Sequence, residues 1–495
     1  MKTKKCIVIY LLSLVTLVIT QSCESILEEP VKSEFSESVL LSQKAGIESV
    51  LADAYGKNIS PRGAVKRGEM VADILWQSGG GAEGMATLLI NFNWDPSSTL
   101  ETFDWIELWQ TIRDANIVLA NVPHASGFNS DTERKQLIAE ARFMRIWAYY
   151  TLWDQYGAMP IRKSVDDPDQ LPRASDDDFK IFMETELKEI LDDIYLEGEE
   201  PAYGRVNRGG ARGLLCLWYL NTHQWQKCID VANDIIASGK YQLCKDYNEM
   251  FDINNEINEE FMLVYSMLAN SGTTNILLAP SWPVDIYMGL DGGINGVVNT
   301  QWSSNASNFR MYKSFYESFD DKDQRKGRIL TKYVNTKGQT IDLLEDNVTN
   351  GKGNIRGIKY PPDPAATANN HGNDFPVIRY AEILLAKAEA MNELSGPNQN
   401  VLDLINEVRD RAGVDELKLN EFSGNKEKLL NQILDERKWE FWYEGKRRRD
   451  LIRRGRFITN AQERGITNAQ NFHVYFPIPQ SAIDANPLLK QNEGY

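Results

Sequence analysis

The sequence contains few of the residues with which enzymes bind metals or build nucleophiles. Four histidines, His124, His223, His371 and His473, lie far apart in a chain of 495 residues, and neither an HExxH nor a Cys-x-x-Cys spacing occurs. The glycine-rich runs lack the Lys-Ser/Thr of a phosphate-binding loop, and no Gly-x-Ser-x-Gly elbow is present. These absences predict a protein without catalytic residues, without a bound metal and without a cofactor.

Cysteine is also scarce, with five residues in the chain. Two of them lie at the extreme N-terminus, which leaves Cys216, Cys228 and Cys244, all in apolar stretches. An odd number of cysteines in apolar stretches favours buried free thiols, and a disulfide between Cys216 and Cys228 remains an alternative.

Positive charge is outnumbered by negative charge. The chain has 54 Lys and Arg against 70 Asp and Glu, which gives a formal net charge of -16 at pH 7. Such a body repels phosphate groups, so no nucleic-acid partner is expected. A basic cluster, Lys446 to Arg456, follows Glu436, Glu440 and Glu444 at helical spacing. This cluster is expected to form ion pairs within the protein.

The N-terminal apolar run is too short to span a membrane. Ile7–Ile19 has 13 residues, whereas a spanning helix needs about 20. It follows three lysines and precedes Ser22-Cys23, a pattern that predicts a lipoprotein signal peptide at residues 1–22 and a lipid anchor on Cys23. Because Thr20 occupies the usual leucine position, secretion without a lipid remains the alternative. Loss of residues 1–22 removes three lysines and no acid, so the net charge becomes -19.

Apolar residues recur at helical spacing in the two outer parts of the chain. Helices are predicted around 108–119 and 141–152, at 176–196, as a hairpin over 211–220 and 225–238, and along most of 380–441. The hairpin has the size of a tetratricopeptide unit but lacks its sequence fingerprint. From about Tyr241 to Asp374 this periodicity fades, Gly, Asn, Asp, Ser and Thr dominate, and short runs such as Phe261–Tyr265 favour strands.

Six motifs are spread along nearly the whole chain. They are Cys23-x3-Leu27-x2-Pro30, Glu140–Arg145 with Tyr149-Tyr150 and Tyr156-Gly157, Asn373–Glu382, Ile405–Arg409 with Arg411–Gly413, Glu436–Arg453, and Phe476–Pro479 with Asn486-Pro487. By these motifs the chain resembles the SusD/RagB family, the surface nutrient-binding lipoproteins of Bacteroidota. The resemblance implies a mainly α fold, in which tetratricopeptide-like helical pairs form the scaffold and a large irregular, loop-rich insertion carries the ligand site.

Periodicity and resemblance together divide the chain into four parts. These are the signal peptide (1–22), an N-terminal SusD-like part with helical scaffold (23–240), a loop-rich ligand lobe (241–374), and a C-terminal helical part with an extended tail (375–495). Charged residues within the motifs have apolar neighbours, so we expect them to be partly buried, paired and part of the scaffold. They are Arg142, Arg379, Glu382, Arg437 and Glu440.

Five aromatic residues lie in polar loops, where helical burial is not required: Trp76, Trp94, Trp282, Tyr287 and Trp302. Flat rings stack on the C–H face of a pyranose, and its hydroxyl groups bond to polar side chains. We therefore predict that these rings bind ligand, assisted by neighbouring Asn91, Asn93, Asp285 and Asn305. The alternative is that the rings fill small cores beneath the loops. The other tryptophans lie in helical segments and are expected to pack.

The favoured function is a non-catalytic, glycan-binding lipoprotein of the outer membrane surface. The family resemblance implies that it passes oligosaccharide to a SusC-like TonB-dependent outer-membrane transporter. A RagB-like peptide-binding lipoprotein of the same uptake system is one alternative, and a secreted polysaccharide hydrolase is another. The loop aromatics favour sugar over peptide, and the absence of a catalytic constellation favours binding over hydrolysis.

The lipid anchor can be tested directly. Cys23→Ala should release the protein into the soluble fraction, because a chain without its signal peptide and without acyl groups has no hydrophobic anchor in the membrane. Membrane fractionation, with protease treatment of intact cells, measures this. A variant that stays membrane-bound and protease-accessible would show that Cys23 is not the anchor.

Overall fold

The computed structural model describes residues 37–57, 60–77, 84–98, 104–283, 285–286, 309–345, 352–367 and 369–495. This part of the chain is mainly α-helical, as predicted. None of its helices is long and apolar enough to cross a membrane. The signal peptide, Cys23, Tyr287, Trp302 and Asn305 lie outside the described residues.

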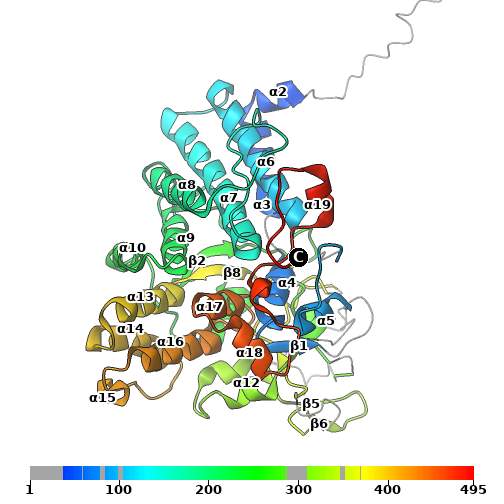
Figure 1. Ribbon diagram of the computed structural model, residues 1–495, viewed down its shortest axis with the longest axis vertical. Helices are drawn as coiled ribbons and strands as arrows, with labels where there is room; N and C mark the ends of the chain where they lie inside the picture. Colours follow the sequence, from blue (N-terminus) through cyan, green and yellow to red (C-terminus); the bar gives the residue numbers. More distant parts are fainter. Residues whose placement is uncertain are drawn as a thin grey trace, which may run out of the picture.

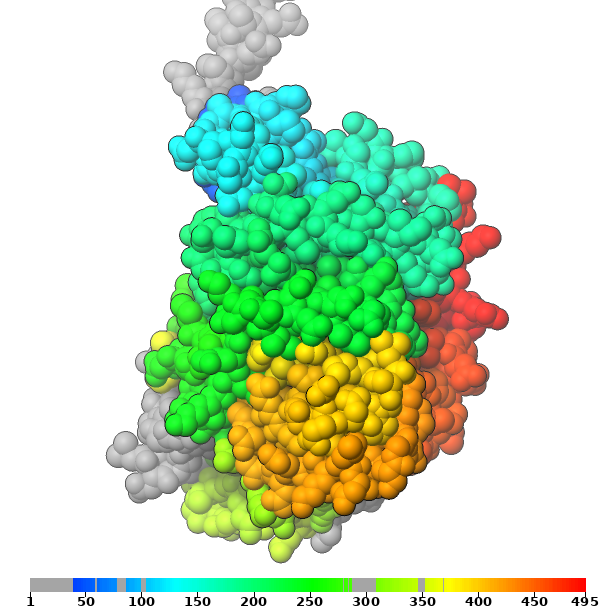
Figure 2. All heavy atoms as spheres, turned by 90° about the vertical axis from the view of Figure 1, so that its left-hand side faces the viewer, coloured from blue at the N-terminus to red at the C-terminus, as the bar shows by residue number. Residues whose placement is uncertain are grey.

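A stack of long helices forms one side of the molecule (Figure 1). Each helix packs on the next along the chain, from α3 through α6, α7, α8, α9 and α10 to α13, which also contacts α14 and α16. Figure 2 shows this side as successive bands of sequence. The bounds are α3 (Lys44–Lys57), α6 (Trp105–Asn121), α7 (Asp131–Tyr156), α8 (Asp176–Glu189), α9 (Arg208–Asn221), α10 (Trp225–Ala237), α13 (Tyr380–Ser395), α14 (Gln399–Arg411) and α16 (Lys426–Glu440).

Local sequence signals define the ends of α7, which has 26 residues. The Ser130 hydroxyl accepts a hydrogen bond from the Glu133 amide at its start, and Gly157, with φ of 79°, ends it. The apolar stripe predicted within it is buried as expected and consists of Ala141, Met144, Ala148 and Leu152.

The predicted helical hairpin is present as α9 and α10. Cys216 on α9 and Cys228 on α10 face each other with their Sγ atoms 3.7 Å apart. Both are buried free thiols, as is Cys244. The favoured interpretation of the cysteines is therefore confirmed, and the alternative disulfide is not formed.

Strand β2 (Phe261–Tyr265), predicted from sequence, pairs in antiparallel register with β8 (Phe375–Arg379). This pair joins the predicted loop-rich region to the C-terminal helices. The other strands are short and form two-stranded sheets, β1 (Leu75–Gln77) with β3 (Phe309–Met311), β4 (Ile329–Leu330) with β7 (Arg356–Gly357), and β5 (Lys332–Val334) with β6 (Thr340–Asp342).

Shorter helices connect these elements. They are α2 (Glu37–Leu41), α4 (Pro61–Val65), a π-helical turn η2 (Lys66–Met70), α5 (Gly84–Asn91), α11 (Leu278–Ser281), α12 (Lys313–Glu317), α15 (Leu419–Phe422), α17 (Arg447–Arg453), α18 (Phe457–Glu463) and α19 (Gln480–Ala485). Phe315 and Tyr360 belong to the same hydrophobic core as the scaffold helices. The described residues of 241–374 therefore share the core of the helices, and the division at residues 241 and 374 stays a prediction.

The charged residues assigned to the scaffold are paired, as predicted. Arg379 is 1% exposed and bonds to Glu440 and Glu444 at 2.9 Å, and also to Glu260. Burial alone would raise the pKa of Glu440, but Arg411 and Arg379 hold that pKa well below its usual value.

The other predicted pairs are present as well. Arg437 bonds to Asp450 at 2.8 Å and to Glu382 at 3.1 Å. Arg142 bonds to Glu186 at 2.9 Å. These contacts join separate helices, so they fix how the helices dock on one another.

The basic cluster forms ion pairs within the protein, as predicted, and several of its partners lie far away in the chain. Arg447 bonds to Asp73 at 2.7 Å and Arg453 to Glu389 at 2.8 Å. No continuous helix joins the glutamates to the arginines: α16 ends at Glu440, and a turn with φ of 75° at Gly445 precedes α17. The arginines therefore point to other parts of the chain, and the glutamates pair elsewhere.

Replacing Arg379 should destabilise the fold strongly. Arg379→Ala leaves three buried carboxylates short of a partner, a change that costs about 3–5 kcal/mol. Equilibrium urea unfolding measures the free energy of unfolding. Lys322→Ala is the control, because Lys322 and Asp415 form an exposed pair that contributes about 0–1 kcal/mol. Unchanged stability with lost ligand binding would instead place Arg379 in the ligand site.

Candidate functional site

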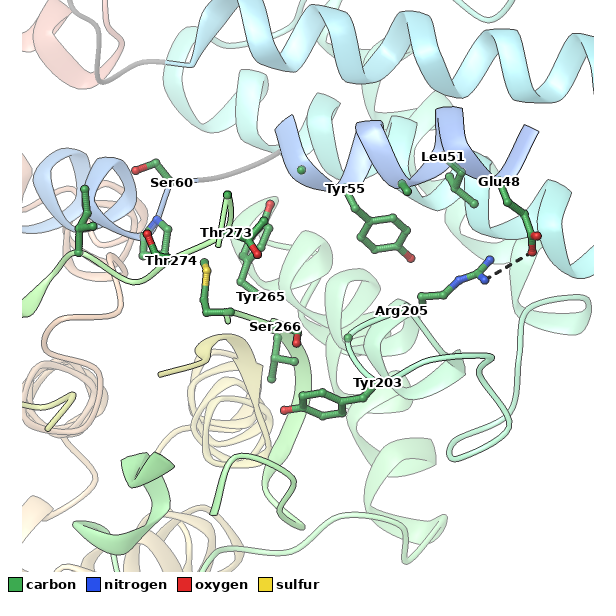
Figure 3. A pocket seen from close by; sticks show the side chains of 18 residues that line it. Glu48, Leu51, Tyr55, Ser60, Tyr203, Arg205, Tyr265, Ser266, Thr273 and Thr274 are labelled. Atoms are coloured by element: carbon green, nitrogen blue, oxygen red, sulfur yellow. Dashed lines mark ion pairs between the residues drawn. The ribbon is translucent and has the colours of Figure 1, made fainter. Parts of the chain in front are cut away.

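A pocket of about 570 Å³ opens between α3, residues 203–205, the end of β2 and residues 272–276 (Figure 3). Its volume lies in the range of small-ligand sites. Three tyrosines and four hydroxyl side chains contribute to the lining, together with Glu48, Arg205 and several apolar groups. The tyrosines are Tyr55, Tyr203 and Tyr265, and the hydroxyl residues are Ser60, Ser266, Thr273 and Thr274.

Helical spacing places one wall of the pocket. Glu48, Ala52 and Tyr55 recur every three or four residues on α3, so they share one face of that helix. On the opposite wall, Gly204 has φ of 86°, and a Cβ there would lie 2.8 Å from the Cβ of Ser266. Only glycine therefore allows residues 203–205 to approach the end of β2 this closely.

A buried carboxylate beneath the pocket holds its two walls together. Glu140 on α7 accepts hydrogen bonds from the Tyr55 hydroxyl and from Nε of Arg205, both at 2.7 Å. The Tyr55 oxygen in turn accepts the Val206 amide at 3.0 Å. Burial raises the pKa of Glu140, although Arg205 opposes that shift. These contacts fix the positions of Tyr55 and Arg205 before any ligand binds.

A pair of carboxyl groups supports the wall that carries Tyr203. The Tyr203 hydroxyl donates to the backbone oxygen of Glu256, and Asp374 Oδ1 accepts the Met267 amide, both at 2.7 Å. The Asp374 amide donates to Oε1 of Glu256 at 2.7 Å. Burial and, to a smaller extent, the neighbouring Asp374 raise the pKa of Glu256 to about 7. Burial likewise raises the pKa of Asp374 to about 6.

The lining suits binding rather than bond cleavage. Its eighteen residues include no histidine and no cysteine, and its one carboxylate, Glu48, lies 3.8 Å from Arg205. Within the described part of the chain, no group of three or more His, Cys, Asp or Glu could hold a metal ion. The pocket thus offers rings and hydroxyl groups without a nucleophile and its base.

The aromatic residues predicted to bind ligand do not meet in this pocket. Trp76 is 6% exposed in β1, where Arg310 and Lys352 lie over its ring. Trp94 is buried and donates to the Tyr495 hydroxyl at 2.7 Å.

Trp282 lies in a second, small core with Leu278, Ile286, Leu330, Leu343 and Ile358. In the structure all three rings are buried, as expected for the packing alternative, and their binding role stays a prediction. The binding role of Tyr287 and Trp302, which lie outside the described residues, stays a prediction.

Two of the polar side chains expected to assist these rings, those of Asp285 and Asn93, form hydrogen bonds within the protein. Asp285 accepts a hydrogen bond from the Tyr333 hydroxyl at 2.7 Å. The Asn93 side chain accepts one from Asn468 at 2.6 Å, and the Asn91 backbone oxygen accepts another at 3.2 Å. None of the three lines the pocket.

Sequence reasoning missed the pocket tyrosines. Tyr55, Tyr203 and Tyr265 come from a helix, a loop and a strand that are distant in the chain. The one local signal was Tyr203-Gly204-Arg205, a glycine between an aromatic and a charged residue just before a helix. That pattern does not reveal which segment packs opposite.

Comparisons with known proteins place the chain in a family. A family model described as "SusD family" matches residues 284–495, and one described as "Starch-binding associating with outer membrane" matches residues 27–199. The chain belongs to the SusD family. The resemblance found in the sequence motifs is confirmed.

Two relatives illustrate the sequence similarity to this SusD-family chain. "Starch-binding protein SusD" of Bacteroides thetaiotaomicron is 26% identical over 470 residues, which cover 82% of this chain and 81% of the relative. "SusD-like protein P38" of Formosa agariphila is 23% identical, with all of both chains covered.

Solved structures confirm the SusD-like fold. Surface glycan-binding protein A from Bacteroides uniformis has a TM-score of 0.74 at 22% identity, covering 90% of this chain and 98% of that one. A laminarin-binding SusD-like protein has a TM-score of 0.74 at 19% identity, covering 92% and 100%.

The carboxyl pair should make stability depend on pH. The folded pKa values of Glu256 and Asp374, about 7 and about 6, lie above the unfolded values of about 4. The stabilisation is therefore complete below about pH 4 and is lost as the pH rises through 6 to 7. Between about pH 5 and pH 8 the free energy of unfolding should therefore fall less for Glu256→Gln than for the wild-type protein.

Urea unfolding at a series of pH values measures this effect. The buried Glu69, whose pKa burial also raises to about 7, is present in both proteins and cancels in the comparison. Glu416→Gln, at an exposed position, is the matched control and should behave as wild type. If Glu256→Gln shows the wild-type pH dependence, the carboxyl pair does not titrate in this range.

Proposed function

We propose that this SusD-family chain is a non-catalytic, lipid-anchored protein of the outer-membrane surface that binds oligosaccharide and delivers it to a TonB-dependent outer-membrane transporter. Family membership is the observation that carries the proposal. One of the two matching family models is described as starch-binding and associated with the outer membrane. A chain of similar fold, with a TM-score of 0.73, has been solved in complex with laminarihexaose.

The pocket supports a sugar as the ligand. Tyrosine rings provide flat apolar surface for the C–H face of a pyranose, and the surrounding hydroxyl side chains can donate to and accept from sugar hydroxyl groups. Because Tyr55 and Tyr203 are already held by hydrogen bonds within the protein, little conformational freedom is lost when a ligand binds.

Delivery to a transporter requires release as well as capture. A few hydrogen bonds and ring contacts of about 1 kcal/mol each leave, after the loss of association entropy, a dissociation constant in roughly the micromolar to millimolar range. The transporter as partner is proposed from the family resemblance. The predicted lipid anchor at Cys23 would keep the protein beside such a channel.

Filling the pocket should abolish sugar binding. Ala52 lines the pocket and is exposed, so Ala52→Trp adds a large ring to the pocket without disturbing the core. Retention in native affinity gels containing laminarin or starch measures binding, and a loss of at least about tenfold is expected.

Ala45→Trp is the matched control. Ala45 is also exposed on α3 and does not line the pocket, so this variant should bind as wild type. Binding that survives Ala52→Trp would place the sugar site elsewhere. Retention of an oligopeptide in place of both glycans would favour the peptide-binding alternative.

A further inference from the structure

Both charged side chains that line the pocket are already paired. Nε of Arg205 donates to Glu140 at 2.7 Å, Nη2 contacts the same carboxylate, and Nη1 lies 3.8 Å from Glu48. Glu48 also lies 3.7 Å from Lys44, which bonds in turn to Glu133. The charge of Arg205 is therefore compensated by two carboxylates before a ligand arrives.

The groups behind the lining add acidic rather than basic character. Glu140 is fully buried beneath one wall, and Glu256 and Asp374 stand behind Tyr203. The remaining polar lining consists of neutral hydroxyl groups. At longer range, the formal net charge of -16 adds further repulsion of anions.

From this arrangement we infer that the pocket selects uncharged oligosaccharides and rejects anionic ones, such as uronates and sulfated sugars. The inference rests on the proposed sugar-binding function and specifies its substrate class. A carboxylate or sulfate that enters the pocket would lose its hydrating water and would find no unpaired cationic side chain in the lining to compensate its charge. A neutral sugar loses only hydroxyl hydration, which Ser266, Thr273 and Thr274 can replace.

A matched pair of probes tests the selectivity. Laminarihexaose and maltohexaose are compared with their C6-oxidised forms, in which each CH2OH becomes a carboxylate while length and linkage stay the same. Calorimetric titration of the wild-type protein at pH 7.5 is run at about 0.02 M and about 1 M salt, where the Debye length falls from roughly 20 Å to about 3 Å.

The neutral probe should bind with the same affinity at both salt concentrations. At each concentration the oxidised probe should bind at least tenfold more weakly than the neutral probe. Discrimination that persists in high salt comes from the pocket rather than from the net charge of the whole protein. An oxidised probe that binds as tightly as its neutral parent in high salt would overturn the inference while leaving the sugar-binding function intact.

Two variants locate the effect. Glu48→Gln removes one of the carboxylates that compensate Arg205 and should raise the affinity for the oxidised probe severalfold relative to the affinity for the neutral probe. Asp53→Asn makes the same change in net charge on the exposed side of α3, outside the pocket lining, and should have no effect in high salt. Equal behaviour of the two variants would overturn the role of the pocket charges. If neither neutral probe binds, the proposed function itself fails.

Discussion

The buried ion pairs around Glu440 hold the structure together at its centre. Arg325, Arg379 and Arg411 all bond to this one carboxylate, and each arginine also contacts at least one other acid. Such a cluster is stable only when complete, because a charge left without its partner in the interior is strongly unfavourable. The elements that supply these residues must therefore dock together.

The same cluster positions the candidate site. Glu260 immediately precedes β2 and Arg379 ends β8, and their ion pair holds these two strands in register. The other end of β2 carries Tyr265, which together with the next two residues forms a pocket wall. A second buried carboxylate, Glu140, ties α3 to residues 205–206 through Tyr55 and Arg205. Ion pairs thus fix both walls, and the carboxylates at their centres, Glu440 and Glu140, are fully buried.

This arrangement separates stability from recognition. The charged groups near the pocket are used within the protein, which leaves rings and hydroxyl groups at its surface. A surface of that kind binds through many weak contacts and has no group activated for chemistry. The proposed function, capture of a sugar and its release to a transporter, needs these properties.

The amino-acid sequence by itself determined the scaffold. Periodicity located the helices from 108–119 to 380–441, and apolar neighbours predicted that Arg379, Arg437 and Glu440 are buried and paired, because both signals come from residues close by in the chain. Only the tertiary structure decided which residues meet. Arg447 bonds to Asp73, 374 positions away, and the pocket joins tyrosines from three distant segments. The burial of Trp76, Trp94 and Trp282 could not be predicted from the sequence either, because a polar loop sequence does not reveal which segments pack over its rings.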